Sequence, residues 1–330
     1  MKIAVDAMGG DYAPEEIVKG VVLALEERDL EIILLGNKIK LEEEIEKYKS
    51  VCKMDKYISI IHCQESVATS ESPLNALRSK KDSSILVGMN LLKKNEADAF
   101  VSAGHSGAIM AGALLVLGCL SKLPRPAIPA VLPTSNGKVL ILDVGANVDC
   151  KPAHLVQFAL MGSKYAQHIF KINNPKIGLL NIGEEENKGN KLTRSTYKIL
   201  KSQKLNFIGN IEGKDIFKGK VDVVVCDGFI GNILLKSSEG LAKFLMMEIN
   251  NKVKERLPLV PEAVFLKQEF MQLAKITDYT EYGGSLLLGV KGLCFICHGR
   301  SKAKAIKNAI INATKFINSD ILQQLELEES

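Results

Sequence analysis

The residues best suited to chemistry lie in a polar loop behind a short apolar run. The loop spans residues 181–190 and reads Asn-Ile-Gly-Glu-Glu-Glu-Asn-Lys-Gly-Asn, directly after Ile177–Leu180. An apolar run that ends in glycine and charge predicts a buried strand and its exit loop. Ligands of α/β proteins bind at the carboxyl ends of strands. A buried or half-buried lysine such as Lys188 would stabilise phosphate and a developing oxyanion, and Glu184 is a candidate ligand-binding carboxylate.

A second loop has the same character. Val221–Cys226 predicts a strand, and its exit reads Asp-Gly-Phe-Ile-Gly-Asn from Asp227 to Asn232. An asparagine amide is a neutral donor suited to an oxyanion hole. The two loops therefore place Lys188 and Asn232 where a reacting group could be held, with Asp227 as a further ligand-binding candidate.

Other predicted strands also end in glycine-bearing loops. The first reads Asp-Ala-Met-Gly-Gly-Asp over residues 6–11, and the others cover 102–108 and 143–149. Free backbone N–H groups at such exits suit an anion, although segment 102–108 alone favours an ordinary capped helix start. The aspartate and asparagine of segment 143–149 could either position loops or contact ligand. The candidate phosphate- or substrate-binding residues are Asp6, Gly9, Gly10, Ser102, Gly104, Ser106, Gly107, Asp143 and Asn147.

Other kinds of catalytic site find little support. Aspartates at the strand ends show no spacing of a known metal loop, so no metal site is predicted. His105 at a helix start is more often a cap or surface residue than a base. A covalent route through Cys226 lacks an evident base partner. The string Cys294–His298 matches haem attachment, but it lies in an apparent buried strand.

The order of elements predicts an α/β fold. Short β-rich runs alternate with helical stretches, which favours a doubly wound, mainly parallel sheet in an α/β/α layer. We expect one domain over residues 1–330, with these glycine-bearing exits in one open sheet. The predicted strands are Lys2–Asp6, Glu31–Leu35, Tyr57–Ile61, Ala99–Val101, Lys138–Asp143, Lys176–Ile182, Val221–Cys226 and Gly292–His298, and the main helices are Glu15–Arg28, Ser83–Lys94, His154–Phe170 and Leu192–Lys201.

One region, from about residue 237 to 275, breaks this alternation. Two helical stretches meet at prolines, which predicts a protruding helical hairpin. Its tip carries Leu257, Leu259, Val260 and Phe265, with basic residues beside them. The tip either packs on a second subunit or on the body, or enters a membrane interface.

Bulk properties limit the class of protein. The 330 residues are 46% hydrophobic and 25% charged, with a net charge of +5 and seven scattered cysteines. No apolar run approaches the ~20 residues of a membrane span. No basic cluster is interleaved with aromatic residues, so nucleic-acid binding is not expected. The chain opens on a strand without a signal peptide, which predicts a cytoplasmic protein with reduced thiols.

Together these segments resemble the bacterial PlsX family, the acyl-[acyl-carrier-protein]:phosphate acyltransferases. The matching strings are the 6–11 opening, Ser102-Ala103-Gly104, Asp143 to Asn147, and the Asn-Ile-Gly-Glu-Glu-Glu string with Lys188-Gly189. Asp227-Gly228-Phe229 with Gly231-Asn232, Tyr282-Gly283-Gly284 and His298-Gly299 complete them, in order, over nearly the full chain. One position departs from the family, since serine at 106 replaces threonine but keeps the hydroxyl.

The resemblance implies a fold shared with isopropylmalate dehydrogenases and phosphotransacetylase. It implies transfer of a long fatty-acyl group from acyl carrier protein to inorganic phosphate, which yields acyl phosphate. Lys188 and Asn232 match the family positions implicated in catalysis. It also implies a homodimer without an organic cofactor, peripheral membrane association, and a product consumed by a membrane glycerol-3-phosphate acyltransferase.

Three rival functions remain open at this point. A β-decarboxylating dehydrogenase would suit the sheet, but no GxGxxG follows the first strand. A short-chain phosphotransacetylase would use coenzyme A thioesters. A non-enzymatic protein would bind phosphate without turnover.

Overall fold

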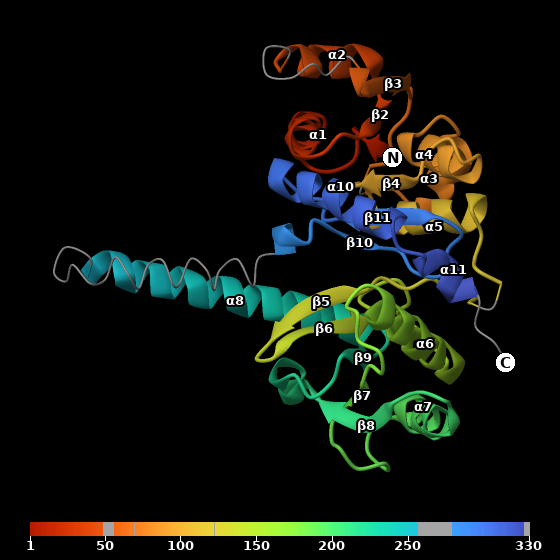
Figure 1. Cartoon of the computed structure of the whole chain (residues 1–330), viewed down its shortest axis with the longest axis vertical. Helices are drawn as coiled ribbons and strands as arrows, with labels where there is room; N and C mark the ends of the chain where they lie inside the picture. Colours follow the sequence, from red (N-terminus) through yellow and green to blue (C-terminus); the bar gives the residue numbers. More distant parts are fainter. Residues whose placement is uncertain (49–55, 69, 122, 257–278, 327–330) are drawn as a thin grey trace. The chain divides into compact units, whose positions relative to one another are not determined.

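The computed structural model describes residues 1–48, 56–68, 70–121, 123–256 and 279–326 (Figure 1). The chain divides into two compact units. Unit 1 comprises Met1–Pro129, Lys164–Asn173 and Tyr282–Ser330, and unit 2 comprises Ala130–Ser163 and Asn174–Glu281. The sequence pattern, which predicts one domain, does not reveal this division.

Unit 1 is built on a six-stranded sheet with the order β10-β11-β4-β1-β2-β3. Neighbouring strands are parallel except for β10 and β11. Continuous apolar strand sequences suit a parallel sheet that is covered on both faces. The strands are β1 (Lys2–Asp6), β2 (Glu31–Gly36), β3 (Ile58–His62), β4 (Ala99–Ser102), β10 (Gly284–Leu286) and β11 (Leu293–Cys297).

The helices of unit 1 form two groups that both contact this sheet. Helix α1 packs on α10, while α3 and α4 pack on α5. Gly20 allows the first contact, because a Cβ there would lie 2.6 Å from the Cβ of Ile306. Phe100 and Ile33 face the second group, in one cluster with Met89 and Ile109. The helices are α1 (Glu15–Glu27), α2 (Lys38–Glu46), α3 (Pro73–Ser79), α4 (Ser84–Lys93), α5 (Ser106–Val116), α10 (Ala303–Ile317) and α11 (Ile321–Glu326).

Unit 2 has a five-stranded sheet with the order β5-β6-β9-β7-β8. Only the β5–β6 pair is antiparallel. Its centre is fully apolar, with every side chain of β9 buried. The elements are β5 (Ala130–Thr134), β6 (Gly137–Leu142), α6 (Pro152–His168, whose last turn belongs to unit 1), β7 (Ile177–Asn181), α7 (Lys191–Ser202), β8 (Phe207–Glu212), η2 (Gly213–Lys218), β9 (Val223–Val225), α8 (Gly228–Arg256) and η3 (Tyr279–Glu281).

The α/β class is confirmed, but the expectation of one open sheet is wrong. The predicted strands divide between two sheets, and β5, β8 and β10 were not predicted. Each missed strand has a weak local signal. Proline interrupts β5, which lies at a sheet edge, glycine and asparagine interrupt β8, and β10 has three residues. Proline and glycine weaken the local sequence signal for a strand, even where hydrogen bonds to a neighbouring strand stabilise it.

The predicted hairpin is described only in part. Its first helical stretch is confirmed as the end of α8, a 29-residue helix that begins at Gly228 and extends beyond the sheet of unit 2 (Figure 1). The tip residues Leu257, Leu259, Val260 and Phe265 lie outside the described residues. None of the helices that the structure describes combines the length and apolar character needed to cross a bilayer. Large exposed apolar side chains occur along α8: Phe229, Ile230, Ile233, Leu241, Phe244, Leu245 and Met247.

Candidate active site

The carboxyl edge of the unit 2 sheet collects both candidate catalytic residues. Strands β6, β9 and β7 are parallel neighbours, so their exit loops emerge at one edge. These exits are residues 143–149, Asp227–Asn232 and 181–190. Parallel pairing therefore places Lys188 and Asn232 at the same edge, on the exits of adjacent strands.

The loop that carries Lys188 is held by its own backbone and by Asn181. The Asn181 side-chain amide donates to the Lys188 carbonyl at 3.2 Å, and Lys188 N donates to the Glu185 carbonyl at 3.1 Å. Gly189 has a φ of +91°, and a Cβ there would meet Asn181 Oδ1 at 2.3 Å. Only glycine fits this turn, so the loop conformation depends on residue 189.

Lys188 is exposed, whereas the sequence favours a buried or half-buried lysine. Its stem lies over Gly183, where a Cβ would be 3.1 Å from Lys188 Cγ. Two carboxylates of the same loop pair with other lysines, Glu184 with Lys220 at 3.6 Å and Glu186 with Lys201 at 2.9 Å. Within the described residues the Lys188 ammonium has no ion-pair partner. Its charge is therefore available to an anion.

Asn232 lies in the first turns of α8, beside the loop that follows β6. A Cβ at Gly145 would lie 3.9 Å from Asn232 Cγ. Asp227 begins the helix, since its Oδ1 accepts a hydrogen bond from Ile230 N at 2.9 Å. Gly231 packs so closely on the β6 exit that a Cβ there would collide with the Asp143 carbonyl. The exposed Asn232 amide is thus presented by a rigid helix start.

Asp143 is a positioning residue of this edge. It is fully buried, and its carboxylate accepts from Ala146 N at 3.1 Å, Asn147 N at 2.6 Å and the Asn147 side-chain amide at 3.1 Å. Asn147 in turn accepts from Gly228 N at 2.7 Å through its carbonyl. Of the two roles predicted for Asp143 and Asn147, this geometry favours the positioning of loops.

Unit 1 has a corresponding edge at which the exits of β1, β4 and β11 meet. Ser102 Oγ donates to Asp6 Oδ2 at 2.6 Å and accepts from Gly104 N at 3.0 Å. A Cβ at Gly9 would lie 2.4 Å from the same Asp6 oxygen, so this position requires glycine. Burial raises the pKa of Asp6, against the lowering effect of its hydrogen bonds from Ser102, Ser84 and the backbone. The buried Asp6 holds loops together and leaves little room for direct ligand contact.

The predicted anion cradle at the start of α5 is largely occupied by protein contacts. Gly104 N donates to Ser102, and Gly107 N donates to Nδ1 of His105 at 3.1 Å. His105 therefore caps the helix, which agrees with the prediction that it is a cap or surface residue more often than a base. Gly10, with a φ of +104°, lies against the Gly299 carbonyl. Ser106 is exposed, so it stays a candidate phosphate-binding residue of this segment.

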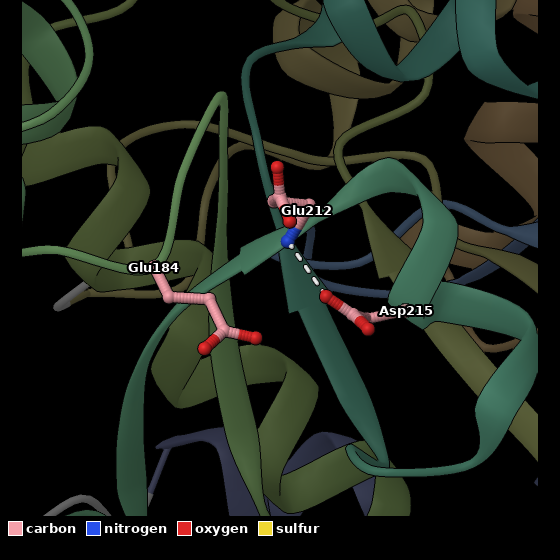
Figure 2. Close-up of side chains that lie close together, drawn as sticks. All are labelled: Glu184, Glu212 and Asp215. Carbon is pink, nitrogen blue, oxygen red and sulfur yellow. Dashed lines mark hydrogen bonds between the residues drawn. The ribbon is translucent and has the colours of Figure 1, made fainter.

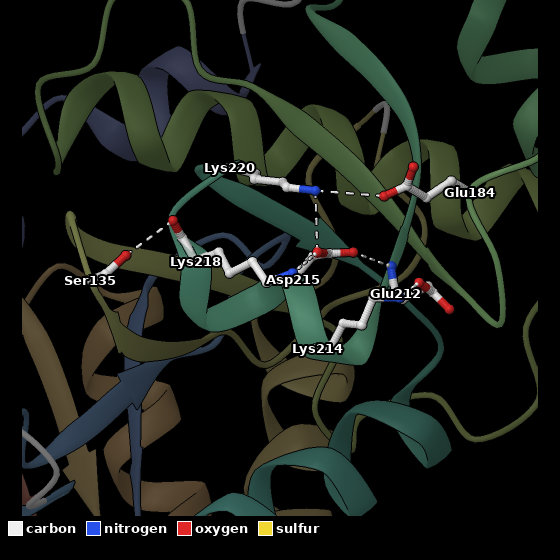
Figure 3. Close-up of polar contacts among 7 residues, drawn as sticks. All are labelled: Ser135, Glu184, Glu212, Lys214, Asp215, Lys218 and Lys220. Carbon is white, nitrogen blue, oxygen red and sulfur yellow. Dashed lines mark hydrogen bonds and ion pairs between the residues drawn. The ribbon is translucent and has the colours of Figure 1, made fainter.

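An acidic cluster beside the Lys188 loop is neutralised by lysines. Glu184, Glu212 and Asp215 lie close enough to share a cation (Figure 2). Lys218 and Lys220 approach Asp215 at 2.9 and 3.2 Å, Lys220 also pairs with Glu184, and Lys214 pairs with Glu212 (Figure 3). The ammonium groups supply the positive charge that a metal would bring, so this is an ion-pair network.

The network holds the Lys188 loop, and sequence reasoning missed it. Lys220 links buried Asp215 to Glu184, and the Asn210 side-chain amide donates to the Glu185 carbonyl at 2.9 Å. The available signal was the reciprocal capping box between Glu212 and Asp215 at the start of η2. Such a box indicates a helix start but not a contact with a loop after another strand.

Replacing Asp215 with asparagine should give a pH-dependent loss of stability. Hydrogen bonds from Lys218 and then Lys220 lower the pKa of Asp215 from 3.8 to about 2. A depressed carboxylate pKa stabilises the fold above the unfolded pKa, and this contribution is lost as the pH falls toward about 2. We expect Asp215→Asn to cost about 1–2 kcal/mol at pH 6, because the lysines are half-exposed, and less at pH 3.

Urea denaturation of wild type and variant from pH 6 to pH 3 checks this difference. Asp29→Asn, at an exposed aspartate, is the matched control and should leave the midpoint unchanged. A deficit that stays constant down to pH 3 would contradict the assigned ion pairs.

Cys226, the cysteine considered for a covalent route, is poorly suited to act as a nucleophile. Cys226 is buried beside Asp143, and burial raises the pKa of its thiol well above the usual range. The thiolate is the nucleophilic form of cysteine. The buried Cys226 thiol is therefore a poor candidate for a covalent intermediate.

Comparison with known proteins identifies the family. A family model described as a fatty acid synthesis protein matches residues 1–324. The chain belongs to this family. A phosphate acyltransferase of Thermoanaerobacterium thermosaccharolyticum is 48% identical over 328 residues, which cover 99% of this chain and 96% of the relative. A phosphate acyltransferase of Geotalea daltonii is 49% identical, with 98% of this chain and 93% of the relative covered.

The resemblance inferred from the motifs is confirmed, and this member of the fatty acid synthesis protein family is an acyltransferase enzyme. A phosphotransacetylase structure from Streptococcus pyogenes matches with a TM-score of 0.63 at 20% identity, covering 96% of this chain and 94% of that chain. At that identity the likeness concerns the fold alone, and it agrees with the phosphotransacetylase-like architecture expected from the sequence.

Proposed function

We propose that this enzyme transfers a long-chain fatty acyl group from the thioester of acyl carrier protein to inorganic phosphate. The acyl phosphate product would serve phosphatidic acid and phospholipid synthesis, with a membrane glycerol-3-phosphate acyltransferase as its consumer. Family membership supports acyl transfer to phosphate. The observation that carries the proposal is the exposed Lys188 ammonium, without a carboxylate partner among the described residues, at the same sheet edge as Asn232.

The reaction needs positioning and charge stabilisation more than a strong base. A phosphate oxygen attacks the thioester carbonyl carbon, the carbonyl becomes a tetrahedral oxyanion, and the carbon–sulfur bond then breaks. Hydrogen phosphate is already a nucleophile at neutral pH, and its own proton can pass to the departing thiolate. Lys188 would bind the phosphate and lower the cost of the added negative charge. Asn232 would donate to the oxyanion from the fixed start of α8.

Phosphate-dependent release of carrier-protein thiol from palmitoyl-carrier protein tests this function. Wild type should release thiol and form palmitoyl phosphate in equal amounts, and only when phosphate is present. Acetyl-coenzyme A serves as the comparison donor. Faster turnover of acetyl-coenzyme A would support the short-chain phosphotransacetylase, and phosphate binding without release from either donor would support the non-enzymatic alternative.

We also propose a peripheral membrane location and a homodimer. The large apolar side chains exposed along α8 support an interaction surface, because extended exposed apolar surface marks sites of association. In this proposal a second copy covers α8, and the apolar tip that follows it contacts lipid. Such an arrangement would deliver an insoluble product at the bilayer surface.

Polar substitution of the hairpin tip should release the protein from vesicles. We expect Leu257→Ser, Leu259→Ser, Val260→Ser and Phe265→Ser together to reduce co-sedimentation with phosphatidylglycerol vesicles at least tenfold, since each removes apolar surface from the interface. Sedimentation velocity should still show a dimer. Unchanged vesicle binding would instead assign the tip to protein packing.

A further inference from the structure

Helix α7 carries a row of cations on its exposed side. Lys191, Arg194 and Lys198 follow one another at helical spacing, so they lie on one face. All three are exposed, while Thr196 and Leu200 are buried on the opposite face. We call these three cations the basic stripe. It spans about 10 Å at 1.5 Å per residue.

No acidic side chain of the described residues neutralises the positive charge of the basic stripe. Helix α7 contains no acidic residue, and no carboxylate of the described residues pairs with any of the three cations. Lys191 and Arg194 stand in or next to the first turn, where the helix dipole disfavours positive charge. This placement weakens the helix, whereas a negatively charged partner would turn the same charges into a favourable contact.

The stripe adjoins the loop of Lys188. Lys191 follows Lys188 after two residues, with Asn190 as the helix cap. At the margin of the stripe, Lys201 pairs with Glu186 at 2.9 Å, which holds the loop along the helix. A partner seated on the stripe would therefore be close to the proposed phosphate-binding lysine.

We propose that the basic stripe of α7 docks an acidic carrier protein that bears the acyl chain as a thioester. This inference rests on the proposed function and assigns the surface that recognises the donor. Charge complementarity favours an acidic partner and steers its approach. A membrane is the less suitable occupant, because Ile199 is the large exposed apolar side chain that the helix offers, and interfacial helices insert a broad apolar face.

Charge reversal of the stripe tests the docking surface. The variant is Lys191→Glu/Arg194→Glu/Lys198→Glu, and the control is Lys19→Glu/Lys40→Glu/Lys93→Glu, which makes the same charge change at exposed lysines of unit 1. Glutamate near the start of α7 suits the helix dipole, so the stripe variant should fold. The donors are octanoyl-carrier protein and uncharged octanoyl-N-acetylcysteamine.

We expect the stripe variant to raise the KM for octanoyl-carrier protein at least tenfold at low salt. Its kcat/KM for the small thioester and its KM for phosphate should stay within twofold of wild type, and the control should match wild type throughout. An unchanged carrier KM, or an equal loss with both donors, would overturn the proposal. So would loss of binding to phosphatidylglycerol vesicles with carrier binding intact.

Binding of the acyl-free carrier protein separates this proposal from the reaction itself. Fluorescence anisotropy of labelled carrier should show binding to wild type and to the control, and at least tenfold weaker binding to the stripe variant. If wild type transfers no acyl group from either donor, the proposed function fails, and the anisotropy result still decides whether the stripe binds the carrier.

Discussion

Lys188→Ala should lower the rate of acyl transfer to phosphate by about 10²–10³-fold. The ammonium group is exposed and lacks an ion-pair partner among the described residues. Its removal therefore leaves no described carboxylate without its partner, and the fold should stay stable. The loop should keep its shape, since the contacts of residue 188 with Asn181 and Glu185 use backbone atoms. Steady-state kinetics with palmitoyl-carrier protein and varied phosphate measure kcat and the KM for phosphate.

Two further variants make the Lys188 result specific. Lys204→Ala removes an exposed cation just beyond α7 and should retain wild-type turnover. Lys188→Arg keeps the charge but changes its shape and should recover only part of the rate. A Lys188→Ala enzyme within threefold of wild type, with an unchanged melting curve, would remove Lys188 from the mechanism.

The elements of the fold with strong local signals could be predicted from the sequence. The apolar run of β1 predicts the bounds that the structure has, and the amphipathic pattern of α1 predicts a helix that ends one residue too late. The division into two sheets could not be predicted in this way. It depends on which strands pair, as when β11, near the end of the chain, joins β4 and completes the first sheet. An apolar run carries no information about its distant partner.

The candidate site, too, has features that could be predicted from the sequence and features that could not. The shared edge of Lys188 and Asn232 follows from parallel neighbours, each with a glycine-bearing exit. The burial of Asp6 and Asp143 could not be read from the sequence, because a polar residue at a strand end is equally compatible with ligand contact and with loop closure. The Asp215–Lys220–Glu184 bridge was also hidden, since it joins residues from the exits of β8 and β7.

The sequence left two interpretations of His105 and of the loop around it. The structure favours the cap, because Nδ1 accepts the Gly107 amide proton. This contact occupies an amide that was expected to bind phosphate. A motif can thus show the right geometry for an anion while its donors already bind protein atoms, which only coordinates reveal.

Asn232→Ala should reduce kcat by about 10²–10³-fold with little change in the KM for phosphate. The oxyanion that Asn232 is proposed to bind exists only in the transition state and the tetrahedral intermediate, so its loss should affect the chemical step. Asn232→Asp should be at least as slow, because an acceptor and a negative charge replace the donor. Ser237→Ala, at an exposed position of the same helix, serves as the control.

The pattern of the kinetic defect decides the role of Asn232. A fall in kcat with a retained KM assigns the amide to the oxyanion. A rise in the KM for phosphate with normal kcat would assign it to ground-state binding beside Lys188 and contradict the oxyanion role. The distinction is sharp because Asn232 extends from α8, whose start is anchored by Asp227 and by the Gly228 contact to Asn147. Removing one amide from so fixed a helix start should leave the remaining groups in place.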